Sequence, residues 1–536
     1  MSGQSTHMPA PRVWRRVQAA TEERLHIRLE SLIVLIGLCA VMSILSPYFL
    51  SVNNFLNILL ATSTIGVLAI AATFVIGSGG LDLSLGSVMG LSGVVGAYVA
   101  VNLGLPALFG ALGCMLAGAT AGFINGQIVT RAFVPAFIVT LGMLGVARGL
   151  GLVISDGRVI YGLPEGLVYL GQGRPFGIPM PVIILLLTAL MTHYVLASTR
   201  FGRYTLAIGD NENAARTAGI QVERHRVILY TLSGALAGLA GMLFMARINS
   251  GDPTAGNHSG DHWRHQPVRR SRVDPWHHGR RLNHGRVAKR PEPVGRPILL
   301  SANGDRRGTR ARRLYRPIPA AQGDSRMTLL GLRNIRKSFG SVEVLHGVNI
   351  EINKGEVIGL VGDNGAGKST LMKTITGMYH ADDGEISLNG ESILRLDPGA
   401  RRDLGIEMIY QDLALAKQLD VASNIFLGRE PLKRFLGVVP GMVDRRSMDQ
   451  RAQEMIDELG AHLPSINRPV GSLSGGQQQT VAIARALTFN PKIVIMDEPT
   501  AALAVREVQS VLDLIRRLKS QGISVILISH RLNDVL

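Results

Sequence analysis

Long apolar runs dominate the first half of the chain and predict a set of membrane-spanning helices. A helix needs about 20 apolar residues to cross a bilayer, and each run approaches or exceeds that length. Helices are the expected spanning form, because each backbone donor must be paired within its own segment. A buried soluble helix bundle is the alternative, and seven such runs before residue 250 argue against it. The runs fall at residues 31–49, 54–78, 85–104, 106–130, 134–154, 176–197 and 227–248.

Charge at the start of the chain sets the expected orientation. Arg12, Arg15, Arg16, Arg24 and Arg28 precede the first apolar run. Positive residues favour the cytoplasmic side of a membrane, so we predict that residues 1–29 form a cytoplasmic N-terminal segment. The chain has two cysteines, both inside apolar runs, which excludes a disulfide framework.

Two polar features interrupt the membrane half. Asp82 lies in the run GSGGLDLSLGSVMGL, where the glycines suggest a broken helix, and we expect its carboxylate to cap a half-helix at Leu83. Substrate contact is the alternative role for an intramembrane carboxylate. Residues 199–220 are polar, and their AARTAGI stretch predicts a short helix outside the membrane rather than a plain loop.

Three runs carry a resemblance to a known family: GGLDLSLGS, FINGQIVTRAFVPAFIVTLGMLGVARG and IGDNENAARTAGI. They resemble the permeases of ribose-type monosaccharide ABC importers, over residues 30–257. The resemblance implies a transmembrane permease domain, here truncated before its final helices. It also implies that the last run is the coupling helix that docks on the ATPase, with that role carried by Asn213, Ala214, Ala215, Arg216, Gly219 and Ile220.

A glycine-rich loop in the second half predicts phosphate binding. An apolar strand, Val357–Val361, leads into the pattern G-x-x-x-x-G-K-S and then a helix. Such glycines let backbone N–H groups surround phosphate oxygens, and the helix N-terminus adds its dipole. The predicted nucleotide-binding residues of the loop are Gly362, Asp363, Asn364, Gly365, Ala366, Gly367, Lys368, Ser369 and Thr370. We expect Lys368 to reach the β- and γ-phosphates and Ser369 to bind Mg²⁺.

Two later strands end in groups suited to phosphate chemistry. The run KIVIMDE delivers Asp497 and Glu498 at a strand end, which predicts Asp497 as a Mg²⁺ ligand and Glu498 as the general base that polarises water. An acidic pair without function is the alternative. His530 follows the run SVILIS at another strand end, from which it could reach the γ-phosphate.

The run LSGGQ, Leu473–Gln477, just before an alanine-rich helix, resembles the signature motif of ABC ATPases. The resemblance spans residues 327–536 and implies an ATPase domain, truncated at its C-terminal end, with ATP and Mg²⁺ as cofactors. It implies that Ser474, Gly475, Gly476 and Gln477 contact the nucleotide of a partner domain across a dimer. It also implies that Gln411 senses Mg²⁺ and that Phe339 stacks on adenine. Residues 501–504 read AALA where many members read S-A-L-D.

The predicted fold is therefore a polytopic α-helical membrane domain followed by an α/β P-loop NTPase domain. The resemblance implies ATP-driven import of a monosaccharide across the bacterial plasma membrane, with the ATPase domain in the cytoplasm. Implied partners are a second ABC ATPase domain, a second permease subunit and a periplasmic or surface sugar-binding protein. A soluble ABC ATPase acting on nucleic acid is a rival class that the seven apolar runs disfavour.

The net charge does not indicate a nucleic-acid partner, because the excess is concentrated in one segment. Residues 258–326 hold 17 Lys or Arg and 5 Asp or Glu, which supplies +12 of the total +17. The segment has no amphipathic period, which predicts a basic disordered linker. Its six histidines show no metal-ligand spacing.

A frameshift is a third interpretation of this segment. Back-translated and read one base later, residues 261–296 permit a sequence that resembles the next part of the same permease family. Met327–Thr328 must be encoded ATG ACN, so the shifted frame stops there at TGA, as in two overlapping genes. On this hypothesis a base error near residues 257–261 fused a permease gene to an ATPase gene, and the fused chain is inactive or artefactual.

Genomic DNA sequenced across the codons for residues 250–330 tests this hypothesis. We expect one base more or fewer, which would restore a complete permease and a separate ATPase beginning at Met327. An unchanged reading frame would establish a true fusion.

Overall fold

The computed structural model describes residues 32–132, 134–248, 328–363, 365–435, 439–499 and 505–529. The predicted N-terminal segment 1–29 and the predicted linker 258–326 lie outside these residues, so both stay predictions.

Six helices among the described residues are long and apolar enough to cross a membrane. They correspond to six of the seven predicted spans. The first predicted span, 31–49, instead contains a shorter apolar helix, Leu32–Leu45, which ends just before Pro47. A residue preceding proline is disfavoured in helical conformation, which explains the early end. The six are α2 (Val52–Gly77), α3 (Leu85–Ala97) with its π-helical extension Tyr98–Asn102, α4 (Ala107–Arg131), α5 (Ala136–Ile154), α7 (Met180–Ser198) and α10 (Val222–Ile248).

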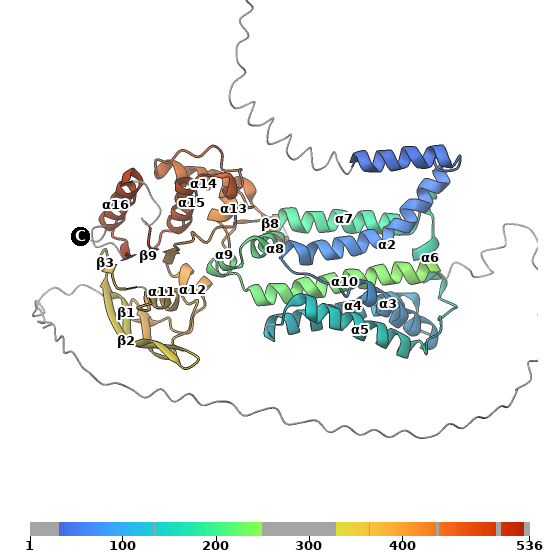
Figure 1. Ribbon diagram of the computed structural model, residues 1–536, viewed down its shortest axis with the longest axis horizontal. Coiled ribbons are helices and arrows are strands. Elements are labelled where there is room, and N and C mark those ends of the chain that lie inside the picture. Colours follow the sequence, from blue (N-terminus) through green and yellow to red (C-terminus); the bar gives the residue numbers. More distant parts are fainter. Residues whose placement is uncertain are drawn as a thin grey trace, which may run out of the picture. The chain divides into compact units, whose positions relative to one another are not determined.

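Helix α10 lies at the centre of the membrane bundle. It packs against α2, α3, α4 and the short helix α6 (Glu165–Gln172) (Figure 1). Its contact with α4 is made by backbone against backbone: a Cβ atom on Gly118 would lie 2.2 Å from the carbonyl oxygen of Gly234, and one on Gly122 would lie 2.1 Å from that of Tyr230. Small residues allow this approach where lipid supplies no hydrophobic drive for association.

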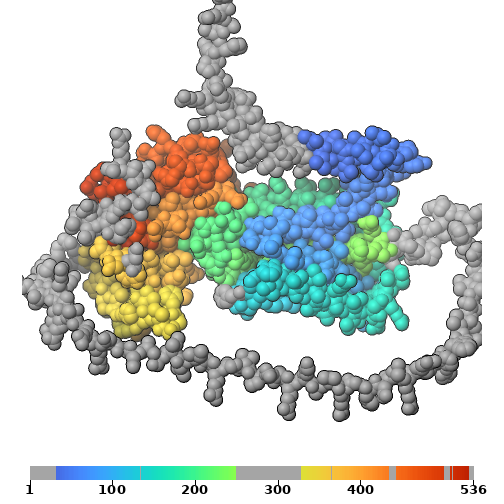
Figure 2. Space-filling view, viewed as in Figure 1, coloured from blue at the N-terminus to red at the C-terminus, as the bar shows by residue number. Residues whose placement is uncertain are grey.

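The outer faces of the bundle are apolar. Several large side chains on α7 are exposed, including Leu186, Leu187, Leu190 and Met191. The bundle surface in Figure 2, coloured blue to green, is formed by such helices. An apolar surface of this extent is expected to face lipid rather than water.

Asp82 lies between α2 and α3, and its predicted cap is shifted by two residues. The helix begins at Leu85 rather than at Leu83, with Ser84 as its N-cap. Asp82 Oδ1 accepts hydrogen bonds from the backbone N–H (2.9 Å) and the hydroxyl (2.6 Å) of Ser84, and Asn125 on α4 donates to that hydroxyl (3.1 Å). Asp82 therefore fixes the turn before the helix, because a short carboxylate readily bonds the backbone two residues ahead.

Two sheets form the ATPase domain within the described residues. One is antiparallel, with strand order β2-β1-β4-β5, and the other is parallel, with order β3-β10-β9-β6. Their strands are β1 (Thr328–Phe339), β2 (Val342–Asn353), β3 (Val357–Leu360), β4 (Asp383–Leu388), β5 (Glu391–Ser392), β6 (Ile406–Ile409), β9 (Ile493–Asp497) and β10 (Ser524–Ile528). The hairpin β7 (Leu432–Phe435) and β8 (Val439–Val443) stands apart, and the helices are α11 (Lys368–Ile375), α12 (Pro398–Asp403), α13 (Val421–Ile425), α14 (Arg445–Glu458), α15 (Gly475–Leu487) and α16 (Val505–Ser520).

The central strands β9 and β10 of the parallel sheet are buried on both faces, as their apolar sequences predict, while the edge strand β3 is partly exposed. Along β9, Ile493 and Ile495 join the core formed with β1, β4 and α11, while Val494 and Met496 join the core formed with α13, α14 and α15. Strand β1 and β2 (yellow) form one surface of the domain in Figure 2. The alternation places the sheet between two hydrophobic layers and holds its strand ends in fixed register.

The contact between α4 and α10 yields a stability prediction. Gly122→Leu forces a side chain into the backbone of Tyr230, and overpacking of this kind costs about 1–3 kcal/mol. We expect a lower midpoint of thermal unfolding in detergent. Gly142→Leu on α5 is the matched control, because nothing lies within 4 Å of its Cβ position. Equal stability of the two variants would contradict the packing.

Candidate nucleotide site

The predicted phosphate loop connects β3 to α11. Gly367 is the N-cap of α11 with φ +85°, and Gly365 has φ +87°. Side chains rarely adopt such angles, so glycine is required for the loop to curl and aim its N–H groups inward. Lys368 begins the helix, and its ammonium donates to the carbonyl oxygens of Gly362 (2.5 Å) and Asp363 (2.9 Å). The loop is therefore a compact anion-binding turn with a cation folded across it.

The two predicted carboxylates and Gln411 meet beside this loop. Strands β6 and β9 are parallel neighbours, so their carboxyl ends lie at the same edge of the sheet. Gln411 follows β6, Asp497 ends β9, and Gln411 Nε2 donates to Glu498 Oε2 at 3.4 Å. Glu498 has φ +49°, a region that non-glycine residues adopt rarely and often at functional sites. Its backbone N–H donates to the carbonyl of Ile528 on β10 (3.0 Å).

The local charges suit a divalent cation. Burial, and then the negative charge of Glu498, raise the pKa of Asp497, while Lys373 and Lys368 lower it. A cation beside this carboxylate would offset both causes of the raised pKa. Ser369, Gln411 and Asp497 offer only oxygen donors to a metal, which fits Mg²⁺. Among the described residues no group of three His, Cys, Asp or Glu is placed to hold a metal ion.

The signature residues begin helix α15. Ser474 is its N-cap, its hydroxyl accepts from the N–H of Gln477 (3.3 Å), and the side chain of Gln477 accepts from the N–H of Ser474 (3.1 Å). This capping box leaves Gly475 and Gly476 in the first turn, where N–H groups have no helical partner. Helix α15 therefore presents a second anion-attracting end.

Helix α15 also contacts the loops that carry Gln411 and Glu498. Its buried Arg485 donates to the carbonyl oxygens of Leu413 (3.2 Å) and Ala414 (2.6 Å), both of which have positive φ. Its Gln479 donates to the carbonyl of Pro499 (2.7 Å). Neither residue belongs to a motif, so the sequence alone carries no signal for these two contacts.

Phe339 ends β1 and stays a predicted adenine contact. Its side chain is 44% exposed, and its ring packs edge-on against Tyr379 with centroids 5.1 Å apart. Asn364, His530 and Ala501–Ala504 lie outside the described residues, so the predictions for them stay untested.

Two short helices of the membrane domain contact the ATPase domain: α8 (Arg200–Asp210) and α9 (Glu212–Thr217). Helix α9 confirms the predicted short helix, while α8 was not predicted. Asn211, between them, caps α9 and donates to the carbonyl of Leu415 (3.1 Å), and Asp210 accepts from the N–H of Gln418 (2.8 Å). Both contacts lie a few residues after Gln411.

The predicted docking residues fall into two groups. Ala214, Ala215 and Ile220 are buried, and Ala215 and Ile220 share an apolar cluster with Leu427 of the ATPase domain. Asn213 is exposed, and Arg216 pairs with Glu212 and Glu223 of its own domain. Ala215 and Ile220 therefore lie at the contact with the ATPase domain, while Arg216 forms its ion pairs within the membrane domain.

Charged contacts that the sequence analysis missed come from α8. Arg200 and Tyr204 both contact the carboxylate of Glu430, and Arg200 also donates to its backbone carbonyl. Burial raises the pKa of Glu430, and the charges of Arg200 and Arg203 oppose that rise. Arg203 is buried against Ser423 and Met448. No motif pairs residues so far apart in sequence.

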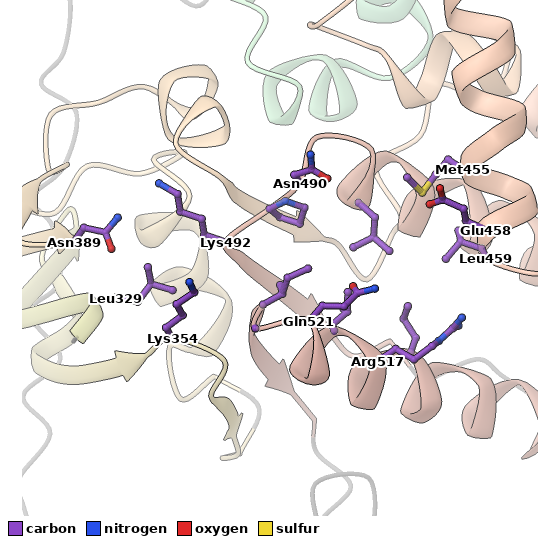
Figure 3. Close-up of a pocket in the computed structure, with 16 residues that line it drawn as sticks. Leu329, Lys354, Asn389, Met455, Glu458, Leu459, Asn490, Lys492, Arg517 and Gln521 are labelled. Atoms are coloured by element: carbon purple, nitrogen blue, oxygen red, sulfur yellow. The ribbon is translucent and has the colours of Figure 1, made fainter. Parts of the chain in front are cut away.

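A cavity of about 910 Å³ lies at the opposite, amino-terminal edge of the parallel sheet (Figure 3). Lys354 precedes β3 and Lys492 precedes β9, and both line it together with Glu458 and Arg517. The cavity is therefore separate from the phosphate loop.

Comparison with protein families finds two matches. Residues 54–260 match the family described as branched-chain amino acid transport system / permease component. Residues 345–501 match the family described as ABC transporter.

Curated proteins similar to this chain align with its second half. The xylose/arabinose import ATP-binding protein XylG of Sulfolobus acidocaldarius is 47% identical over 204 residues, 38% of this chain and 79% of that protein. The fructose import ATP-binding protein FrcA of Rhizobium meliloti is 44% identical over 209 residues, which are 39% of this chain and 80% of that protein. The ribose import ATP-binding protein RbsA of Caldanaerobacter subterraneus is 42% identical over 207 residues, 39% of this chain, which spans 40% of that longer protein.

Glu498→Gln separates nucleotide binding from hydrolysis. The amide keeps the shape and the contact with Gln411 but cannot accept a proton, so we expect turnover to fall by about 10²–10⁴-fold with ATP affinity retained. Phosphate release measures the turnover, and binding of a fluorescent ATP analogue measures the affinity for ATP. Glu391→Gln, on the exposed β5, is the control. Full turnover in Glu498→Gln would exclude Glu498 as the base.

Proposed function

This chain belongs to the ATP-binding-cassette transporter family, and from that premise we propose that it drives the import of a monosaccharide across the plasma membrane by hydrolysing ATP. The permease and the ATPase domain are joined in one multi-pass membrane chain, with the ATPase domain in the cytoplasm. The identity of the cargo as a monosaccharide and the transport activity of this chain are what we propose.

One observation carries the proposal. Asp210 ends α8, and Asn211 lies between α8 and α9, the two helices that dock on the ATPase domain. Asn211 contacts the backbone of Leu415 and Asp210 that of Gln418, both close in sequence to Gln411. Gln411 in turn contacts Glu498. A change at the γ-phosphate thus has a short route to the membrane domain, which is what coupling between ATP hydrolysis and transport requires.

The chain's residues have separate tasks in hydrolysis. The loop N–H groups and Lys368 would hold the phosphates, and Ser369, Asp497 and Gln411 would hold Mg²⁺, which would neutralise negative charge on the phosphates. Glu498 accepts a proton from the attacking water. Ser474, Gly475, Gly476 and Gln477 would contact the nucleotide held by a second ATPase domain, and Phe339 would stack on adenine.

The names of similar proteins support a monosaccharide as cargo. The three relatives described above are named for import of xylose or arabinose, fructose and ribose. The permease match is to a family described for branched-chain amino acids, so the ATPase half carries this argument. A second permease subunit and a sugar-binding protein are the further partners that an importer of this kind needs.

Reconstitution of the full chain in liposomes tests the function. We expect vanadate-sensitive, Mg²⁺-dependent ATP hydrolysis and ATP-dependent uptake of one of xylose, arabinose, ribose or fructose when the cognate binding protein is added. Lys368→Ala should remove both, because a phosphate contact is lost, while Lys354→Ala at the distant cavity should keep both. Hydrolysis that none of these sugars changes, with no uptake, would contradict the proposal.

The hypothesis of two fused genes has its own support. The permease match ends at residue 260, within the stretch 257–261 where the frame is expected to shift. On this hypothesis the same function belongs to two separate proteins. Transport by a restored permease together with a separate ATPase, and not by the fused chain, would favour it.

A further inference from the structure

The carboxyl end of α9 packs against two glycines of the ATPase domain, Gly399 and Gly428. Gly219, just after the helix, has φ +82°, and a Cβ atom there would lie 2.6 Å from the Cα of Gly399 on α12. A Cβ atom on Gly428 would lie 2.2 Å from the carbonyl oxygen of Ala218. Backbone therefore packs directly on backbone, and α9 cannot shift without moving α12.

Arg402 of α12 binds this helix end. Its Nη1 donates to the carbonyl oxygen of Ala218 at 2.8 Å, and Ala218 is the C-cap of α9. Terminal helix carbonyls lack a partner within the helix and carry partial negative charge, so a guanidinium fits there. Arg402 Nε also bonds the carboxylate of Glu407 (3.2 Å), which accepts from Arg429 (2.8 Å). Arg402 and Glu407 are both buried.

The neighbouring Arg401 points to a different element. It is 1% exposed and donates to the carbonyl oxygens of Thr374 (2.6 Å) and Ile375 (2.8 Å), at the end of α11. It also donates to the carbonyls of Leu394 and Leu396. Helix α11 has only 8 residues and begins at Lys368, so Arg401 holds one end of a rigid element whose other end is the phosphate loop.

Glu407, the ion-pair partner of Arg402, lies on the strand that leads to Gln411 and its contact with Glu498. Glu407 lies in β6, four residues before Gln411, and Gln411 contacts Glu498. By contrast, α8 contacts Ser423 and Met448 on α13 and α14 and Glu430 beyond α13. The α8 contacts join the two domains, while α9 contacts α12, whose arginines bond the end of α11 and Glu407 of β6.

We propose that α12 links the permease to the nucleotide site, with Arg402 as the positioning residue that holds α9 and Arg401 as the residue that holds α11. The link rests on the proposed function and adds a route through α11 to the route through the Gln411 loop. Successive residues of a helix point about 100° apart, so two adjacent arginines on one rigid turn can hold two different elements.

A thiol reporter on the far side of the membrane domain tests the link. Val159 follows α5, beyond the end opposite the docking helices, and is 61% exposed. The parent is the full chain with Val159→Cys and Cys39→Ser, because Cys114 is fully buried. In liposomes, we measure the rate of maleimide reaction with and without Mg-ATP and vanadate, together with KM for ATP.

We expect Arg402→Gln to reduce the nucleotide-induced change in reaction rate on the order of tenfold, with KM for ATP nearly unchanged. Gly219→Ala should give the same loss from the permease side, without changing the sequence of the ATPase domain. The two together should lose no more than either alone, because both disrupt the same packing of the end of α9 on α12. Arg402→Lys keeps one donor for Ala218 and should restore part of the response.

Arg395→Gln, exposed and just before α12, is the matched control and should keep the full response. A full response in both Arg402→Gln and Gly219→Ala would overturn the link. Because Gly219→Ala leaves the sequence of the ATPase domain unchanged, the test stands even where Arg402→Gln does not fold. A parent that hydrolyses ATP with no change at Val159→Cys contradicts the transport function itself, and the link with it.

Discussion

Parallel pairing of β3, β10, β9 and β6 is the constraint on which the nucleotide site depends. Leu360 pairs with Ile528, Ile528 pairs with Asp497, and Met496 pairs with Ile409, so these strands end together. The phosphate loop, Glu498 and Gln411 each follow one of those ends. The two apolar layers that cover the sheet hold the register, because a slip by one residue would move each close-packed side chain into the layer on the other face.

The membrane domain contacts the loops and the short helix next to that edge. Asn211 and Asp210 bond backbone groups after Gln411, and the end of α9 rests on α12. Arg485 joins the signature helix to the same loop. The groups predicted to bind phosphate and the groups that contact the permease are therefore separated by one short element in each case, so small displacements at one can alter the other.

The membrane bundle follows a different physical rule. Its helices pack closely at glycines such as Gly118 and Gly122. Lipid is as apolar as the side chains, so no hydrophobic effect drives the helices together and close packing must do so. Larger side chains, such as those of α7, face outward instead. Central α10 begins directly after the docking segment, so the element at the centre of the bundle is continuous with the surface that meets the ATPase domain.

The sequence by itself determined the features that depend on neighbours in the chain. Six long spans, the strand–loop–helix around Lys368, the strand that delivers Asp497 and Glu498, and the short helix α9 all arise from local pattern and spacing. The start of α3 at Leu85 and the early end of the first helix were missed by a few residues, since turns involve local bonds that periodicity does not record. Only the tertiary structure decided the docking contacts: Arg402 and Ala218 are 184 residues apart, and Tyr204 and Glu430 are 226 apart. Such pairs have no sequence signal, because either side chain alone looks like an ordinary surface charge or loop residue until folding buries both.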